Sequence, residues 1–151
     1  MVETFIRPLK AEDRVAWSRL WTSYLDFYQT RLPPEVTEDL FVRLIGEGGH
    51  KGLVAERGGT LIGFAHYLFH PSTWSAAPSC YLEDLFIEAN MRGTGAGRRL
   101  IEAVYTAADR AGGGAVYWHT HHQNVRARQL YDRVGNLTDF VKYERPQVTN
   151  S

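Results

Sequence analysis

The sequence predicts a mixed α/β structure in which helices pack against a sheet, and three observations lead to this class. Apolar residues recur at helical spacing from Ala11 to Gln29. Residues 52–70 contain two apolar, β-branched or aromatic runs joined across two glycines, a pattern typical of a β-hairpin. After Cys80, strand patterns alternate with helix patterns, which requires a crossover that lays helices on a sheet.

The first half of the chain is expected to hold a strand, two helices and the hairpin. Thr4–Leu9 is typical of a short strand, and the helix of residues 11–29 follows it. Two successive prolines then end this helix, because a proline disfavours helical backbone at the residue before it. Thr37 can cap a second helix that runs to about residue 45.

The second half is expected to hold a loop and five further elements. In order, these are a loop at residues 71–78, a strand at 80–89, a helix at 95–111, a strand at 115–120, a helix at 125–134 and a final strand around 140–144. The first of these helices follows a glycine-rich turn and ends at three successive glycines, which commonly terminate helices. We expect a single domain that spans residues 1–151.

Composition and charge exclude several classes of protein. Seventeen basic residues balance seventeen acidic ones, so the chain lacks the excess that attracts nucleic acid or an anionic membrane surface. No apolar run approaches the roughly 20 residues that span a membrane, and the first residues lack the basic start and apolar core of a signal peptide. Cys80 is the one cysteine and cannot form an internal disulfide. We therefore expect a cytoplasmic protein with no nucleic-acid or membrane partner.

Residues 88–104, "EANMRGTGAGRRLIEAV", place three glycines and an arginine directly before an amphipathic helix. Such a turn directs unpaired backbone N–H groups and the positive end of the helix dipole at one point, which suits a phosphate. Glycine allows positive φ and a close approach of the anion, and the guanidinium of Arg92 adds a charged donor. The alternative is a glycine turn that only joins a strand to a helix.

The spacing of the glycines excludes two common phosphate-binding motifs. A Walker loop ends in Gly-Lys-Ser/Thr, whereas Gly97 is followed by two arginines. The dinucleotide fingerprint needs a third glycine where Leu100 stands, and "AVYWHT" offers no carboxylate for a ribose. We therefore expect neither an ordinary P-loop nor an NAD site.

Two motifs resemble those of the GNAT superfamily of N-acetyltransferases. Arg92-x-x-Gly95-x-Gly97, directly after "YLEDLFI", is similar to the acetyl-CoA signature of that family. "NVRARQLYDRVG" is similar to a later family motif, which this chain matches at Asn124, Ala127, Leu130, Tyr131 and Gly135. The order of helices and strands also matches over nearly all of the chain. Asn136 departs from the family, in which an aromatic residue is common there, and the last strand is short.

This resemblance implies an α/β (α+β) GNAT fold, with a central mixed, mostly antiparallel sheet flanked by helices, and acetyl-CoA as the co-substrate. It implies that the pyrophosphate of coenzyme A binds to the turn made of Arg92, Gly93, Thr94, Gly95, Ala96 and Gly97. It further implies that the pantetheine arm pairs with the backbone of Leu85, Phe86 and Ile87. By the same resemblance, Asn124 steadies the cofactor and Tyr131 lies near its sulfur.

Acetyl transfer to an amine requires a neutral nucleophile, yet an alkyl amine with a pKa near ~10 is charged at neutral pH. "YLEDLF" supplies two carboxylates, Glu83 and Asp84, and strand alternation puts them on opposite faces, so that only one faces the cleft. The polyamine and thialysine acetyltransferase branch carries a similar "YLED" strand. This resemblance favours Glu83 as the base, directly or through a water. The alternative is that Glu83 only caps or pairs with a basic neighbour.

A phenol with a pKa near ~10 can protonate a departing thiolate, and Tyr131 fits this role unless it is only a core tyrosine. No metal is expected, because His119, His121 and His122 lack a second cluster of ligands. These histidines can line the acceptor pocket or face water. Cys80 is expected to be a buried cysteine rather than an acyl carrier.

The first two helices overhang the acceptor cleft in the fold that the chain resembles. Tyr24 and Tyr28 belong to an aromatic row too broad for one buried stripe, and we expect them, with Glu83 and His119, to contact the acceptor. Residues 24–40 carry four acidic residues against one arginine. This charge would attract a cationic amine, or it belongs to a solvated helix face.

The sequence thus predicts an acetyl-CoA-dependent N-acetyltransferase that acts on a primary amine, such as a polyamine, an amino acid or a lysine side chain. "LWTSYLDFY" is similar to the branch that contains histone, polyamine and D-amino-acid acetyltransferases, and this branch implies a homodimer. Two other classes stay open: a catalytically idle acyl-CoA-binding module, and a nucleotide-binding interaction domain that uses the same turn.

Overall fold

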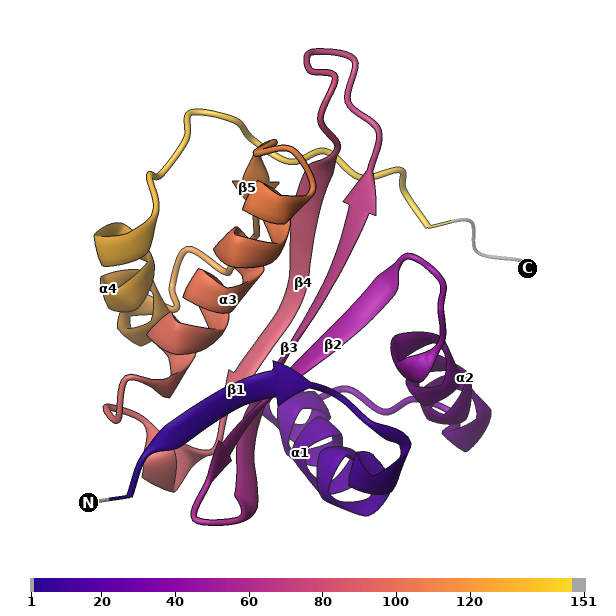
Figure 1. Cartoon of the computed structure of the whole chain (residues 1–151). Coiled ribbons are helices and arrows are strands. Elements are labelled where there is room, and N and C mark those ends of the chain that lie inside the picture. The colour runs from indigo at the N-terminus through magenta and orange to yellow at the C-terminus, as the bar shows by residue number, and fades with distance from the viewer. Residues whose placement is uncertain (1, 148–151) are drawn as a thin grey trace.

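The computed structural model describes residues 2–147, and it consists of a five-stranded sheet with helices on both faces (Figure 1). The elements are β1 (Thr4–Pro8), α1 (Arg14–Phe27), α2 (Pro34–Ile45), β2 (His50–Arg57), β3 (Thr60–His70), β4 (Ser79–Ile87), α3 (Ala96–Arg110), β5 (Val116–Tyr117) and α4 (Val125–Val134). Short 3-10 turns at Ala11–Asp13 and Ala89–Met91 precede α1 and follow β4. This is the mixed α/β arrangement that the sequence predicts.

The strands lie in the order β1-β2-β3-β4-β5. Neighbouring strands from β1 to β4 pair antiparallel, and β4 with β5 is the parallel pair. β2 and β3 are joined by the predicted two-glycine hairpin at residues 58–59. The sheet is therefore mixed and mostly antiparallel, as expected.

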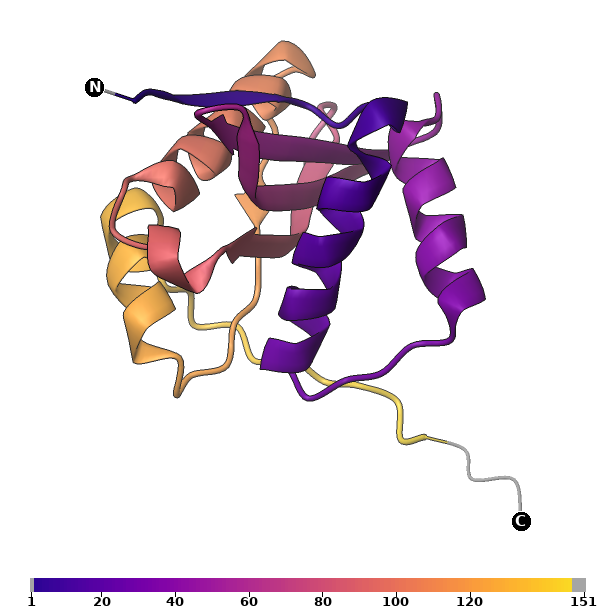
Figure 2. The same cartoon turned by 90° about the horizontal axis from the view of Figure 1, so that it is seen from below.

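Helices lie on both faces of the sheet (Figure 2), and a separate apolar core lies beneath each helical layer. On one face, α3 contributes the fully buried Leu100, Ile101 and Val104. α1 and α2 cover the other face, where Trp17 and Phe41 pack together. The helical spacing of apolar residues lets each helix bury one side against the sheet.

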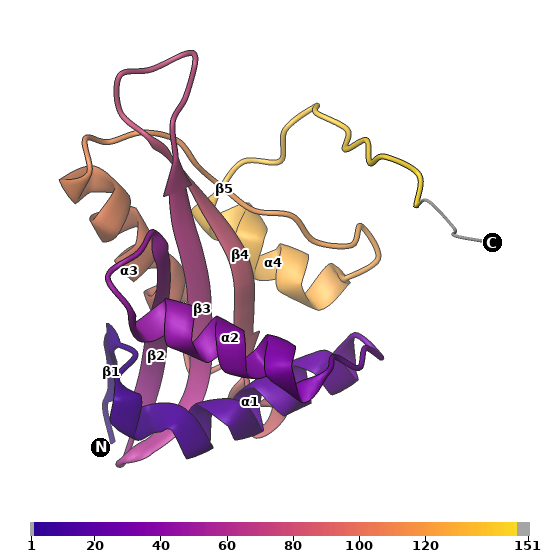
Figure 3. The ribbon, with the colours of Figure 1, turned by 90° about the vertical axis from the view of Figure 1, so that its right-hand side faces the viewer.

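β4 and β5 separate soon after they pair (Figure 3). Their pairing consists of Cys80 with Val116 and Tyr81 with Tyr117. The strand predicted at residues 115–120 is therefore reduced to two residues. From Leu82 onward, this edge of β4 has no strand beside it among residues 2–147. Backbone N–H and C=O groups on such an edge can pair with an extended ligand.

A β-bulge in β4 overturns one expectation about the two carboxylates. Pairing with β3 steps from Leu82 opposite Tyr67 to Asp84 opposite His66, so Glu83 is an extra residue in the strand. The extra residue cancels the alternation of side chains. Both carboxylates have their contacts on the face that α1 and α2 cover. The expectation that Glu83 and Asp84 point to opposite faces is therefore wrong.

Two predicted elements also differ from the structure. α2 begins at Pro34 rather than behind a Thr37 cap, because a proline suits the first helical position, where no N–H is needed. Thr37 instead accepts a hydrogen bond from Trp21 Nε1 (3.2 Å). No strand forms around residues 140–144, because this segment is exposed and has no strand beside it among the described residues.

Candidate active site

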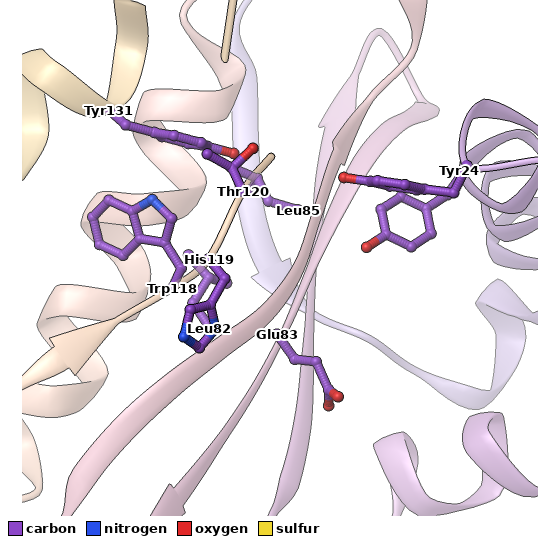
Figure 4. A pocket seen from close by; sticks show the side chains of 9 residues that line it. Tyr24, Leu82, Glu83, Leu85, Trp118, His119, Thr120 and Tyr131 are labelled. Atoms are coloured by element: carbon purple, nitrogen blue, oxygen red, sulfur yellow. The ribbon is translucent and has the colours of Figure 1, made fainter. Parts of the chain in front are cut away.

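A pocket opens where β4 and β5 separate (Figure 4). Its walls come from β4, from the segment that follows β5, from α1 and its C-terminal end, and from α4. The lining residues are Tyr24, Tyr28, Leu82, Glu83, Leu85, Trp118, His119, Thr120 and Tyr131. The pocket therefore lies between the two helical layers, beside the unpaired edge of β4.

Tyr131 reaches the pocket from α4. Asn124 caps this helix, because its side chain accepts a hydrogen bond from the backbone N–H of Ala127 (3.4 Å) and donates one to Thr120 (3.4 Å). The Tyr131 ring packs edge-on against Trp118, with centroids 5.5 Å apart. Burial raises the pKa of Tyr131 to about 12. The phenol therefore keeps its proton through the neutral range and can donate it.

Glu83 stands on a different side of the pocket from Tyr131 (Figure 4). Its side chain is 44% exposed. Partial burial and the negative charge of Asp84 raise the pKa of Glu83, while the positive charge of Arg43 acts in the opposite direction. A carboxyl group with a raised pKa is a stronger base at neutral pH than an ordinary one.

Asp84, next to Glu83, is held by two hydrogen bonds from neighbouring elements. Tyr24 Oη donates to Oδ1 (2.7 Å), and His66 Nδ1 donates to Oδ2 (3.0 Å). His66 is fully buried, and its Nε2 accepts from Trp17 Nε1 (3.1 Å). Because an indole can only donate, the neutral His66 ring must carry its proton on Nδ1. This chain of bonds fixes the Tyr24 ring in the pocket wall.

The glycine turn forms the start of α3, as predicted. Gly95 caps the helix with a φ of 85°, and Gly93 has the same φ, so both occupy the left-handed region that favours glycine. A Cβ added at either position would meet no atom of residues 2–147 within 4 Å, so these residues leave the outer side of the turn open. Arg92 Nε donates to the Ile87 carbonyl (3.3 Å). These features fit a bound diphosphate.

The structure brings together six of the residues chosen from the sequence. Tyr24, Tyr28, Glu83, Leu85, His119 and Tyr131 all line the same pocket. Phe86 packs its side chain into the core under α1 and α2, and Asn124 caps α4. Contact of Phe86 or Asn124 with coenzyme A stays a prediction.

Sequence reasoning missed three residues that line the pocket and one that supports it. Trp118 and Thr120 flank His119 in "YWHT", so the sequence pointed to this segment but not to these two residues. Leu82 gave no signal beyond that of a core residue. His66 lies in the middle of an apolar strand, and its partners Trp17 and Asp84 are far from it in the sequence. Only the fold brings these side chains together.

The surroundings of His119 and Cys80 bear on metal binding and on thiol reactivity. Among residues 2–147, no three His, Cys, Asp or Glu side chains lie close enough to hold a metal ion. His119 Nδ1 lies 3.4 Å from the hydroxyl of Tyr81. Burial raises the pKa of Cys80 to about 11, which disfavours the reactive thiolate. None of the helices in the described part of the chain is long and apolar enough to cross a bilayer.

Comparisons with known proteins agree with this geometry. The profile of the Acetyltransferase (GNAT) family matches residues 16–135. The chain is 41% identical over 144 residues to the D-amino-acid N-acetyltransferase HPA3 of Saccharomyces cerevisiae, covering 93% of this chain and 89% of that protein. It is 32% identical over 79 residues to the thialysine N-epsilon-acetyltransferase of Bos taurus, covering 52% of this chain and 46% of that protein.

Solved structures show the same fold. The aminoglycoside N-acetyltransferase AAC(6')-Iy, solved in complex with CoA, has a TM-score of 0.84 at 18% identity and covers 98% of this chain and 97% of its own. The family profile spans most of the chain, and the yeast relative matches nearly all of it. The chain therefore belongs to the Acetyltransferase (GNAT) family and is an N-acetyltransferase that takes its acetyl group from acetyl-CoA.

Proposed function

We propose that this enzyme acetylates the primary amine of a small molecule, with a free amino acid as the first candidate and a polyamine or a lysine side chain as the others. The observation that carries the proposal is the shared pocket, in which Glu83 and Tyr131 both stand beside the free edge of β4. The name of the yeast relative, a D-amino-acid N-acetyltransferase, supports an amino-acid acceptor.

Glu83 is proposed to take the proton of the amine, directly or through a water. An ammonium ion near the carboxylates of Glu83 and Asp84 must lose a proton before its nitrogen can attack. The raised pKa of Glu83, which follows from burial and from the charge of Asp84, supports this role. Tyr24, Tyr28 and His119 complete the wall that would contact the acceptor.

Tyr131 is proposed to donate its proton to the departing sulfur. Acetyl-CoA supplies the acetyl thioester when it is bound. The open turn at residues 92–97 would hold its diphosphate, and the backbone at residues 85–87 would pair with its pantetheine arm. The side chain of Asn124 keeps the end of α4, and so Tyr131, in place.

A screen of amines tests this proposal through the release of free thiol from acetyl-CoA. D- and L-amino acids, polyamines and lysine peptides are compared with the parent protein, with Glu83→Gln and with Glu102→Gln, which alters an exposed carboxylate on α3. We expect turnover with at least one primary amine and a loss of about 10²-fold or more in Glu83→Gln alone. Equal turnover in Glu83→Gln and Glu102→Gln would show that Glu83 is not the base. A polyamine as the best acceptor would replace the amino acid as substrate.

We also propose that the chain acts as a cytoplasmic homodimer of one domain, residues 1–151, of which residues 1 and 148–151 lie outside the described part. Leu137, Phe140, Val141 and Tyr143, near the C-terminus, are between 75% and 92% exposed. Apolar side chains gathered on one exposed segment support burial against a second copy. Light scattering is expected to give twice the chain mass of 17.2 kDa, and a mass of 17.2 kDa would contradict the dimer.

A further inference from the structure

Two histidines lie behind the neighbouring carboxylates of Glu83 and Asp84. His66 on β3 donates to Asp84, and His50 at the start of β2 lies beside Glu83. The two imidazole centroids are 6.4 Å apart. Both ring nitrogens of His66 have partners, Trp17 and Asp84, whereas His50 has no role in the proposed steps of the reaction.

The tautomer of His50 follows from its partner. Arg43 Nη1 on α2 lies 3.0 Å from His50 Nδ1. Because a guanidinium has no acceptor atom, Nδ1 must accept, and the neutral ring carries its proton on Nε2. Burial lowers the pKa of His50, and the positive charge of Arg43 acts in the same direction. The ring is therefore neutral at neutral pH and presents an N–H at Nε2.

Within the described part of the chain, this N–H lacks an acceptor at hydrogen-bond distance. His50 Nε2 is buried and has no protein partner among residues 2–147. Oε1 of Glu83 lies 3.9 Å from it, beyond the range of a hydrogen bond. A buried donor without an acceptor is unfavourable, and the half-exposed Glu83 side chain has rotatable bonds that can close this gap.

We propose that His50 is a positioning residue of the active site, whose Nε2–H donates to Glu83 and holds that carboxylate ionised and aimed at the acceptor, while Arg43 fixes the tautomer. The inference rests on the proposed role of Glu83 as the base. A donated hydrogen bond favours the ionised carboxylate, which opposes the effects of burial and of Asp84 on the pKa of Glu83. The charged and titratable groups that face Glu83 are Asp84 on β4, His66 on β3, His50 on β2 and Arg43 on α2.

The pH dependence of kcat/KM for the best acceptor tests the proposal. His50→Leu removes the donor, so the pKa of Glu83 rises and the acidic limb of the profile moves up by about one pH unit. His50→Gln keeps an N–H near the position of Nε2, whereas His50→Asn places its amide near Nδ1. We therefore expect the acidic limb of His50→Gln to lie at nearly the same pH as that of the parent. The acidic limb of His50→Asn should lie at nearly the same pH as that of His50→Leu. An unmoved limb in His50→Leu, or equal limbs in the Gln and Asn variants, would overturn the proposal.

Long-range ¹⁵N–¹H spectra of the imidazoles test the same contact without turnover or a change at His50. We expect the proton of His50 on Nε2 and that of His66 on Nδ1. Glu83→Gln should shift the Nε2 resonance of His50 and leave that of His66 nearly unchanged. A proton on Nδ1 of His50, or an unshifted Nε2, would reject the contact. If no amine is acetylated but the spectra behave as expected, the role of Glu83 as base fails while the pairing with His50 stands.

Discussion

The hydroxyl of Tyr24 on α1 lies 2.7 Å from Oδ1 of Asp84 on β4, so one hydrogen bond joins the first helix to the strand that carries the pocket. The same carboxylate accepts from His66 on β3. Burial and the charge of Asp84 raise the pKa of Tyr24, which keeps its hydroxyl a donor. Asp84 therefore joins α1 and β3 to β4, next to the proposed base.

Substitutions at these two positions should reduce stability in a definite order. Tyr24→Phe removes one bond and leaves Asp84 paired with His66, so we expect a loss of about 0.5–1.5 kcal/mol in the free energy of unfolding. Asp84→Leu leaves two donors without an acceptor and should cost about 2–4 kcal/mol. Asp84→Asn should cost less than Leu, because an amide can accept from His66 and donate to Tyr24. Urea unfolding measures the series, and the exposed Tyr143→Phe is the control. A loss in Asp84→Leu no larger than that in Tyr24→Phe would contradict the shared carboxylate.

Alanine substitutions at two glycines with similar backbone conformation distinguish the effect of backbone strain on stability from an effect on cofactor binding. Gly95 in the turn has a φ of 85° and Gly113 after α3 has a φ of 78°, and a Cβ on either would meet no atom of the described residues within 4 Å. Alanine at each position should cost about 1–2 kcal/mol of stability through the left-handed backbone. Gly95→Ala should also weaken coenzyme A binding about tenfold, because relief of the strain turns amides away from the anion. Calorimetry is expected to show unchanged coenzyme A affinity in Gly113→Ala. An equal loss of affinity in both variants would show that the turn does not bind the cofactor.

Tyr131→Phe tests the proposed proton donor. The phenol lies in the pocket and its pKa is raised to about 12 by burial, so it stays protonated over the assay range. Removal of the hydroxyl should lower kcat about 10²-fold, with the dissociation constant of coenzyme A within about twofold of the parent value. Because the donor stays protonated, the parent should show no loss of rate from this group up to about pH 10. Rapid-quench kinetics with the best acceptor measure the rate of the chemical step. An unchanged rate in Tyr131→Phe would mean that Tyr131 contributes packing and not a proton.

Local patterns account for what could be foreseen of this site, and long-range contacts account for what could not. Tyr131 and the glycine turn lie in short motifs whose spacing is visible in the chain. The shared face of Glu83 and Asp84 depends on a bulge, and the bulge depends on the pairing of β4 with β3 rather than on either strand alone. The segment near Phe140 has apolar residues that suit a strand, yet a strand also needs a neighbour, which no pattern within the segment specifies.

The ion pair between Arg7 and Asp13 gives a pH-dependent prediction away from the pocket. The Arg7 guanidinium donates two hydrogen bonds to the Asp13 carboxylate (2.8 and 2.9 Å), and the Lys10 backbone N–H donates a third (2.8 Å). The bonds from Arg7 hold the pKa of Asp13 below its usual value, and the Lys10 bond acts in the same direction.

Because the pKa is lower in the folded state, the unfolded state binds the proton more readily, so this stabilisation is present above about pH 4 and is lost as the pH falls through the folded pKa. Asp13→Asn should therefore lower the free energy of unfolding by about 1–2 kcal/mol at pH 7, and by progressively less below pH 4. Urea unfolding between pH 2.5 and pH 7, ~0.5 unit apart, would measure the difference, with Asp109→Asn on the exposed end of α3 as the control. A difference between Asp13→Asn and the parent that stays constant down to the lowest pH would mean that the carboxylate contributes through shape and packing rather than through its charge.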